Sequence, residues 1–408
     1  MTGRAGVFRS VAEHQRAVCD LIRARPADTV AVSDALGLVL AADVVAPLAL
    51  PVFDNSAMDG YAVRAEDITA ADPDSPVKLP VAEDIPAGRT DRLTLAPGTA
   101  HRIMTGAMMP LGATAVVPVE RTDAGISEVA IFAAARPGQH IRRCGEDVAE
   151  GSTVLERGRV ITPAAVGLAA ALGVASLPVI PRQRVLVVST GSELVTAGTR
   201  LLPGQIYESN AVMLAAAVRE AGAEVAGVAA SSDDVAQFTA ALDAHDGRAD
   251  LIITSGGVSA GAYEVVKDSF TDGSVEFVKV AMQPGMPQGA GRTRSGCPLI
   301  ALPGNPVSAL VSFEVFLRPA LRAAMGLPQP ERARRTAVLT EAVTSPPGKR
   351  QFRRGVYDPA TGTVRAYGPP ASHHLRWLAS ANCLLEIAED VDELAAGERV
   401  DVWNLADS

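Results

Sequence analysis

The feature that most constrains the fold is an alternation of buried strands and helices between residues 182 and 326. Each predicted strand is a continuous run of β-branched and other apolar residues, which is typical of parallel strands buried on both faces. The predicted strands are residues 185–189, 224–229, 251–254 and 299–302, and the predicted crossover helices are residues 210–221, 235–244 and 306–323. This order predicts a doubly wound α/β domain, in which ligands bind at the carboxyl ends of the strands.

The chain before this domain has a different pattern. Residues 11–24 and 30–47 are predicted helices because of their apolar residues, and a further helix is expected at residues 162–173. Between the second and third helices, short β-type runs such as 113–119 and 129–133 alternate with Gly, Pro and Asp. We therefore expect a small, mostly β insert that interrupts a helical module.

The chain after the α/β domain begins with a linker rich in proline and charge at residues 328–332. Short strand-like runs and Gly or Pro turns follow, which predicts a small β domain or barrel. Several domains are expected, because 408 residues exceed what one core usually fills. They are a helical and linker module of residues 1–46 and 142–178, the β insert of residues 47–141, the α/β domain of residues 179–326 and the C-terminal β domain of residues 327–408.

Composition excludes several classes of protein. A net charge of −9 argues against a nucleic-acid surface, because binding to phosphates needs a cationic face. No apolar run approaches the roughly 20 residues of a membrane span, and residues 1–16 lack the apolar segment of a signal peptide, so we expect a cytoplasmic protein. The cysteines Cys19, Cys144, Cys297 and Cys383 lie far apart, which argues against a disulfide framework or a zinc site.

Small residues follow three of the predicted strands. The segments are Ser189-Thr190-Gly191-Ser192-Glu193, Ser255-Gly256-Gly257-Val258-Ser259-Ala260-Gly261 and Pro303-Gly304-Asn305-Pro306-Val307-Ser308. Glycine lets the backbone approach a ligand closely and leaves its amides free for phosphate. Three such strand ends in one domain predict a pocket for a nucleotide or a pterin phosphate.

One of these segments also satisfies the G-x-S-x-G pattern of a serine hydrolase, with Ser259 as the nucleophile. That reaction needs an acid and a histidine farther along the chain. Only His373 and His374 follow, beyond the linker and in a separate predicted domain, so neither is expected near Ser259.

An acidic turn lies between two apolar runs at residues 51–63. Asp54, Asn55, Ser56 and Asp59 supply two carboxylates, an amide and a hydroxyl next to Gly60. Side chains that converge at such a bend suit a hard cation, whereas a surface turn stabilised by its own Asp and Asn side chains is the alternative.

Together with further motifs, this turn resembles the MoeA/gephyrin E-domain family of molybdopterin molybdenumtransferases. The further motifs are Arg102-Ile103-Met104-Thr105-Gly106-Ala107, Ile141-Arg142-Arg143-Cys144-Gly145-Glu146-Asp147, Gln205-Ile206-Tyr207-Glu208-Ser209-Asn210 and Pro303-Gly304-Asn305-Pro306-Val307-Ser308-Ala309. They follow the order and approximate spacing of the family over nearly the whole chain.

The resemblance implies a MoaB/MogA-like α/β domain and an established reaction. The family joins molybdate to the dithiolene of adenylylated molybdopterin and releases AMP, assisted by Mg²⁺. Its homodimers build each site from the α/β domain of one subunit and the β insert of the other. Molybdoenzyme apoproteins and other proteins of cofactor biosynthesis are further expected partners.

The resemblance also implies roles for individual residues. The catalytic residues would be Asp59, Thr105, Asp147 and Glu193, and the metal ligands would be Asp233, Asp234 and Glu264. The substrate-binding residues would be Arg142, Ser255, Gly256, Gly257, Ser259, Lys267, Pro303, Gly304, Asn305, Pro306, Ser308 and Ser372. As an alternative, Glu193 and Asp233 would only cap the helices that follow them.

Three positions depart from the family. Gln283 and Met286 stand where two lysines are common, and Glu264 stands where an aspartate is usual. Loss of a charged hydrogen bond commonly costs about 1.5–3 kcal/mol, which weakens the binding of an anion. A noncatalytic carrier of molybdopterin is therefore the alternative to a functional transferase.

Overall fold

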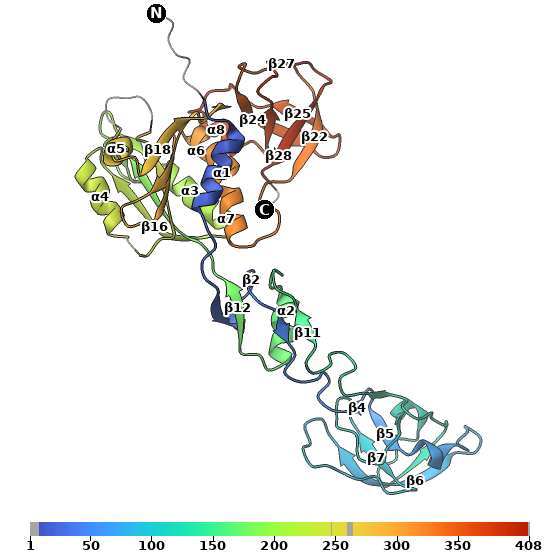
Figure 1. Ribbon diagram of the computed structural model, residues 1–408. Helices are drawn as coiled ribbons and strands as arrows, with labels where there is room; N and C mark the ends of the chain where they lie inside the picture. Colours follow the sequence, from blue (N-terminus) through green and yellow to red (C-terminus); the bar gives the residue numbers. More distant parts are fainter. Residues whose placement is uncertain (1–7, 246, 259–263, 407–408) are drawn as a thin grey trace, which may run out of the picture. The chain divides into compact units, whose positions relative to one another are not determined.

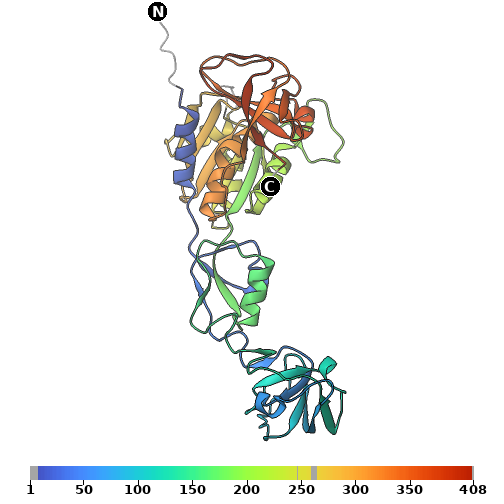
Figure 2. The ribbon, with the colours of Figure 1, turned by 90° about the vertical axis from the view of Figure 1, so that its right-hand side faces the viewer.

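The computed structural model describes residues 8–245, 247–258 and 264–406. Its contacts divide the chain into two compact units, residues 29–178 and residues 1–28 with 179–408. Figure 1 labels their elements, and Figure 2 shows the same ribbon turned by 90°. The finer division into four segments stays a prediction.

A mixed six-stranded sheet forms the centre of the larger unit (Figure 1). Its strands, in spatial order, are β16 (Glu224–Ser231), β13 (Arg184–Thr190), β17 (Leu251–Ser255), β21 (Pro298–Leu302), β20 (Pro287–Arg292) and β18 (Val275–Lys279). The first four are parallel, which confirms the strands expected from their apolar runs. They align the carboxyl ends of β13, β17 and β21 along one edge of the sheet.

The two antiparallel strands β20 and β18 were not predicted. Glycine is unfavourable within a strand, and β20 contains Gly289 and Gly291. Both glycines have a packing reason, because a Cβ on Gly291 would lie 2.1 Å from the carbonyl oxygen of Ser274 and one on Gly289 would lie 2.8 Å from the Phe277 ring. Close packing against β18 therefore outweighs the low strand propensity of these two glycines.

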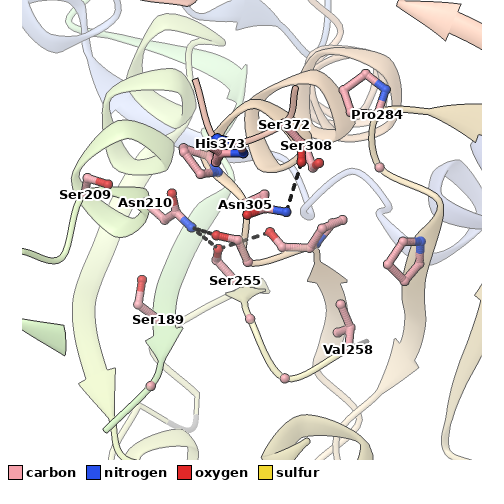
Figure 3. A pocket seen from close by; sticks show the side chains of 18 of the residues that line it. Ser189, Ser209, Asn210, Ser255, Val258, Pro284, Asn305, Ser308, Ser372 and His373 are labelled. Carbon is pink, nitrogen blue, oxygen red and sulfur yellow. Dashed lines mark hydrogen bonds between the residues drawn. The ribbon is translucent and has the colours of Figure 1, made fainter. Parts of the chain in front are cut away.

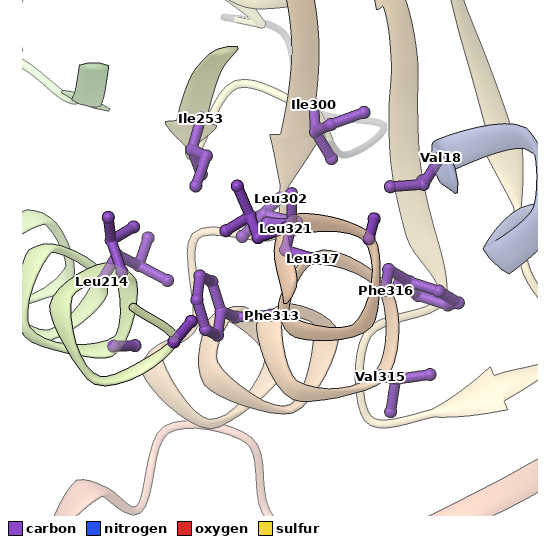
Figure 4. Close-up of a cluster of buried hydrophobic side chains, with 14 of the residues drawn as sticks. Val18, Leu214, Ile253, Ile300, Leu302, Phe313, Val315, Phe316, Leu317 and Leu321 are labelled. Atoms are coloured by element: carbon purple, nitrogen blue, oxygen red, sulfur yellow. The ribbon is translucent and has the colours of Figure 1, made fainter. Parts of the chain in front are cut away.

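Helices cover both faces of this sheet. The predicted crossover helices are confirmed as α3 (Asn210–Glu220), α4 (Val235–Asp243) and the run α6 (Pro306–Ser312), η4 (Phe313–Leu317) and α7 (Arg318–Ala324), in which η4 is π-helical. On one face, side chains from α1 (Val11–Leu21), α3 and the α6–α7 run join one apolar core with the sheet (Figure 4). On the other face, α4 and α5 (Val265–Ser269) pack Phe238 and Val266 against Leu186. The doubly wound fold is thus confirmed.

A closed five-stranded barrel occupies the C-terminal region, as predicted. The strands are β22 (Arg334–Leu339), β24 (Arg350–Asp358), β25 (Thr363–Ala366), β26 (Cys383–Ile387) and β28 (Arg399–Asn404), with the short pair β23 (Val343–Thr344) and β27 (Glu393–Leu394) and helix α8 (Leu375–Ala379) outside the ring. Pairing of β24 with β26 closes the ring. A strand from the α/β region, β19 (Met282–Gln283), extends the barrel sheet by pairing in parallel with β24. The barrel is therefore joined to the α/β region by main-chain hydrogen bonds.

The smaller unit contains a five-stranded sheet, in agreement with the predicted β-rich segment. Its strands, in spatial order, are β8 (Ala115–Pro118), β5 (Gly60–Val63), β7 (Ala100–Ile103), β6 (Val77–Ile85) and β9 (Glu128–Ile131), accompanied by the 3-10 turns η2 (Ala65–Ile68) and η3 (Val119–Arg121). Tyr61, Ile68 and Ile131 are fully buried in its core. The same unit contains a separate pair of short strands, β4 (Asn55–Ser56) and β10 (Ile141–Arg142). Each of the two strands lies within one of the family motifs.

The helix predicted at residues 30–47 is wrong. The structure has the 3-10 turn η1 (Val32–Asp34) and the strands β1 (Asp28–Ala31), β2 (Val39–Leu40) and β3 (Val44–Val45) there. β1 and β2 pair with β12 (Ser176–Ile180), and β3 pairs with β11 (Thr153–Leu155). Paired valines favour strands, and Gly37 has a positive φ of 74°, which breaks a helix. The expected third helix is confirmed as α2 (Pro163–Ala171), whose N-cap Thr162 accepts a hydrogen bond from Ala165.

Each of the four cysteines is free. Within the described ranges, the helices are all too short or too polar to cross a bilayer.

Candidate functional site

A large cavity of about 1180 Å³ opens at the carboxyl ends of β13, β17 and β21. Its wall includes twelve of the residues expected at the site: Glu193, Asp233, Ser255, Gly256, Gly257, Glu264, Pro303, Gly304, Asn305, Pro306, Ser308 and Ser372. The three strand ends rich in small residues therefore meet at one place, as doubly wound topology requires.

Asn210, the first residue of α3, joins two of these strand ends (Figure 3). Its Nδ2 donates to Ser255 Oγ at 2.8 Å and to the carbonyl oxygen of Gly304 at 2.6 Å. Glycine is required beside this contact, because Gly256 has a φ of 98° and a Cβ there would lie 2.8 Å from the Thr190 carbonyl oxygen. The cavity floor is thus a rigid junction of two loops and a helix start.

Glu208 holds the end of a third strand, β13. Its side chain was given no predicted function, although it lies in the motif of residues 205–210. Its Oε1 accepts from Ser189 Oγ at 2.7 Å and from the Ala211 amide at 2.6 Å. The short pair β14 (Leu194–Val195) and β15 (Ile206–Tyr207) leads into this residue and also lines the cavity. Glu208 therefore fixes the end of β13 relative to α3.

The two neighbouring aspartates have different surroundings. Asp233 Oδ2 accepts from the Ser192 amide at 3.0 Å and from Ser192 Oγ at 2.9 Å, and Asp233 lines the cavity. Asp234 instead caps α4 by accepting from the Gln237 amide at 2.8 Å. The capping role weighed for Asp233 thus belongs to Asp234. Within the described cavity wall, neither Asp234 nor Lys267 is found.

The carboxylates fit a magnesium ion shared with a substrate. The described part of the chain has no group of three or more His, Cys, Asp or Glu side chains able to hold a metal by themselves. Mg²⁺ is usually bound through one or two carboxylates together with substrate phosphates and water. Glu193, Asp233 and Glu264 line one cavity and offer such carboxylates.

The barrel contributes residues that the sequence analysis did not bring to this site. Lys349, just before β24, and His373, just before α8, both line the cavity. The expectation that His373 lies away from the strand ends is therefore wrong. Asn305 Nδ2 donates to Ser372 Oγ at 3.0 Å, which holds the barrel loop against the end of β21.

All three departures from the family, Gln283, Met286 and Glu264, also lie in this wall. β19 pairs Gln283 with Gln351 at the start of β24, close in sequence to Lys349, which lines the same cavity. Lys349 Nζ lies 5.8 Å from the centroid of the Phe8 ring. In the described wall, Lys349 is the sole lysine or arginine. Ser259 falls outside the described residues.

The remaining predicted site residues lie in the smaller unit. Asp59 Oδ1 accepts from the amide and from Oγ1 of Thr105, both at 2.7 Å. These two bonds, the backbone bond first, hold the pKa of Asp59 below its usual value. Arg142 is exposed and lies opposite Asn55 in register, and Asp147 is exposed with its amide bonded to the Leu50 carbonyl.

Other members of the acidic turn have separate partners. Asp54 accepts from the Cys144 amide at 2.8 Å and from Arg143 Nη1 at 2.7 Å, and these contacts lower its pKa, the backbone bond being the larger cause. Asn55 donates to the Phe53 carbonyl, and Ser56 Oγ donates to the Met58 carbonyl. Asp54, Asn55 and Ser56 therefore each have their own hydrogen-bond partners.

Comparisons with known proteins agree with this architecture. Family models match residues 9–173 as the "MoeA N-terminal region (domain I and II)", residues 187–323 as the "Probable molybdopterin binding domain" and residues 336–405 as the "MoeA C-terminal region (domain IV)".

Similar proteins extend over almost the whole chain. Molybdopterin molybdenumtransferase 2 of Mycobacterium tuberculosis is 68% identical over 405 residues, which are 98% of this chain and 100% of that protein. Molybdopterin molybdenumtransferase 1 of the same organism is 38% identical and covers 98% and 99%. The crystal structure of the molybdopterin biosynthesis protein MoeA from Pyrococcus horikoshii matches with a TM-score of 0.81 at 30% identity, over 98% of this chain and 100% of that one. The chain belongs to the MoeA family.

Proposed function

We propose that this protein is a molybdopterin molybdenumtransferase that joins molybdate to adenylylated molybdopterin and releases AMP. The observation that carries the proposal is the composition of the cavity wall. The α/β region supplies the carboxylates of Glu193, Asp233 and Glu264, and the barrel supplies Lys349. A wall with both kinds of charge suits a cation bound to a pyrophosphate together with a small oxyanion.

The loops at the strand ends would bind the pterin phosphate of the substrate. Gly256, Gly257 and Gly304 place backbone close to the cavity, and Asn210 keeps two of these loops in register. A positioned substrate loses less freedom in the reaction, which lowers the barrier. We assign the pterin phosphate to this side of the cavity.

Glu193, Asp233 and Glu264 would hold the magnesium ion. When bound, Mg²⁺ supplies positive charge to the pyrophosphate and stabilises AMP as a leaving group. Ser192 donates two hydrogen bonds to Oδ2 of Asp233, which orients the carboxylate toward such a ligand. Hydrogen bonds to a metal-binding carboxylate commonly tune the affinity of the site for its metal.

Homodimerisation is part of the proposal. Asp59, Thr105, Arg142 and Asp147 would act on the substrate bound by the partner subunit. Two inactive variants, Asp59→Asn and Glu193→Gln, should then restore activity when mixed, because one site of the heterodimer contains neither substitution. Light scattering gives the mass of the particle. A monomer, or a mixture that stays inactive, would reject this arrangement.

The cellular setting is also proposed here. The protein would act in the cytoplasm and pass its product to molybdoenzyme apoproteins or to other proteins of cofactor biosynthesis.

A noncatalytic carrier is the second candidate. The neutral side chains of Gln283 and Met286 in the cavity wall favour it, because each removes a cationic contact for an oxyanion. The deciding experiment mixes the purified protein with adenylylated molybdopterin, molybdate and Mg²⁺ and follows AMP release and molybdenum incorporation together. Coupled release and incorporation support the transferase, whereas tight binding without turnover supports the carrier.

Serine hydrolysis is the third candidate, through Ser259. His373 lines the same cavity as the loop that leads to this serine, so the reaction needs a direct test. A fluorophosphonate probe labels an activated serine. Failure to label the protein would reject this candidate.

A further inference from the structure

His373 is a titratable side chain of the cavity wall that the proposed function has not used. It lies on the barrel loop that ends at α8, directly after Ser372 (Figure 3). The Ser372 carbonyl accepts from the Val307 amide at 3.1 Å, and Ser372 Oγ accepts from Asn305. The His373 carbonyl accepts from the Leu375 amide at 3.0 Å. The backbone around this histidine is therefore held in place from both sides.

The imidazole of His373 is available to a ligand. The side chain is exposed, and the described residues include no hydrogen-bond partner for either of its ring nitrogens. Its ring packs against that of His374, at a centroid distance of 4.3 Å and an interplanar angle of 74°. This ring-to-ring contact uses neither ring nitrogen.

The proposed reaction includes a step that needs proton transfer. When molybdate joins the dithiolene, two Mo–S bonds form, one Mo–O bond breaks and two thiol protons are lost. The oxo group leaves as water with two protons, so the overall step is balanced and molybdenum keeps its oxidation state. AMP, in contrast, is a weakly basic leaving group, and water supplies the oxygen when its pyrophosphate bond is cleaved.

We propose that His373 is a catalytic residue that transfers a proton from a thiol of the substrate to the departing oxo group of molybdate. The inference rests on the proposed transferase function. Imidazolium gives a proton to the oxo group, and the neutral imidazole then takes one from a thiol and returns to its starting state. The second thiol proton reaches the same oxygen, so that water leaves.

Other groups in the wall suit this role less well. An imidazole has two ring nitrogens, so one can give a proton while the other accepts one, whereas the ammonium of a lysine has donors alone. Lys349 would therefore hold the anion. The titratable groups of the described wall are Glu193, Tyr207, Glu208, Asp233, Glu264, Lys349 and His373, with His374 behind the His373 ring.

The test measures single-turnover molybdenum incorporation with adenylylated molybdopterin, molybdate and Mg²⁺ across a range of pH. General acid–base groups contribute about 100-fold to 10,000-fold, so we expect His373→Gln to slow incorporation by about this factor. The pH profile of the rate in His373→Gln should also differ from that of the wild type. Added imidazole should restore part of the rate in His373→Gly. His374→Gln, the matched control, removes the ring contact and should keep the wild-type pH profile.

The possible results separate the two proposals. A wild-type protein that neither releases AMP nor incorporates molybdenum would reject the transferase itself. A wild-type protein that is active, with an unchanged rate and pH profile in His373→Gln, would reject only the role of His373. An equal loss in His374→Gln, without imidazole rescue of His373→Gly, would show that the histidine pair is structural and would overturn the inference.

Discussion

Arg332 Nε lies 2.9 Å from Glu314 Oε2, and the two side chains are only 2% and 4% exposed. This buried pair joins the linker before the barrel to the π-helical turn of the α/β region. Arg318, also buried, lies 3.6 Å from the same carboxylate oxygen, and burial lowers its pKa to about 10. Glu314 thus faces two buried cations, and Arg332 Nη2 also bonds to Glu220 Oε1 at 2.6 Å.

Removal of this carboxylate should destabilise the larger unit strongly. Breaking a buried ion pair by deleting one partner commonly costs about 3–5 kcal/mol, because the remaining charge is left in the interior. We expect Glu314→Leu to lower the free energy of unfolding in urea by about this amount. The control is Glu331→Ala, which breaks an exposed pair with Arg334 and should cost at most about 1 kcal/mol. Equal small effects of both substitutions would contradict the prediction.

His14 should make stability depend on pH. Its side chain is fully buried against Phe316, and burial, followed by the charge of Arg9 and opposed by Glu276, lowers its pKa to about 4 from the ordinary 6.5. The folded protein therefore keeps this histidine neutral, so the stabilisation is complete above pH 6.5 and is lost as pH falls toward 4. The free energy of unfolding falls by about 3 kcal/mol, because each unit of difference between the folded and unfolded pKa contributes about 1.36 kcal/mol.

Unfolding in urea at pH 7 and pH 5 tests this prediction. His14→Leu removes the titration and should flatten the pH dependence over this interval relative to the wild type. An identical pH dependence in the two proteins would show that His14 does not supply it.

Lys349 should set the affinity for molybdate. As the one lysine or arginine of the described cavity wall, it would give molybdate a charged hydrogen bond, which is commonly worth about 1.5–3 kcal/mol, or roughly 10-fold to 150-fold in affinity. We expect Lys349→Met to raise the Kd of molybdate by this factor in calorimetric titration. Gln283→Lys should lower it, since that side chain lies in the same wall. Lys279→Met, an exposed position on β18, is the control.

Thr105 should control the acidity of Asp59. The Thr105 hydroxyl is the second cause of the lowered Asp59 pKa, after the Thr105 amide. Thr105→Ala removes the hydroxyl and keeps the amide, so the pKa of Asp59 should rise but stay below its ordinary value. A carboxyl titration by NMR measures this change, and an unaltered pKa would show that the hydroxyl contributes nothing.

The parts of the fold that were predicted are those with a local signal. The strands of the doubly wound sheet follow from continuous apolar runs, and the cavity follows from the small residues after them. The error at residues 30–47 arose because the apolar pattern of Val39 and Leu40 satisfies a helix as well as short strands with distant partners. β20 was missed because its glycines are explained only by the close approach of β18.

The missed site residues depend on contacts between distant segments. Lys349 reaches the cavity because β24 pairs with β19, and His373 reaches it because Ser372 bonds to Asn305, 67 residues earlier in the chain. Neither residue follows a strand of the α/β sheet. No local pattern could therefore have placed them with the strand ends.

The pairing of β19 with β24 has a consequence for exchanging parts between relatives. Gln283 lies in the α/β segment of the sequence but in the barrel sheet of the structure. A chimera joined at the linker of residues 328–332 would take β24 and Lys349 from one parent and β19 from the other. The anion site would then combine residues of both parents. A chimera that keeps the anion specificity of one parent must therefore take residues 282–287 from the same parent as the barrel.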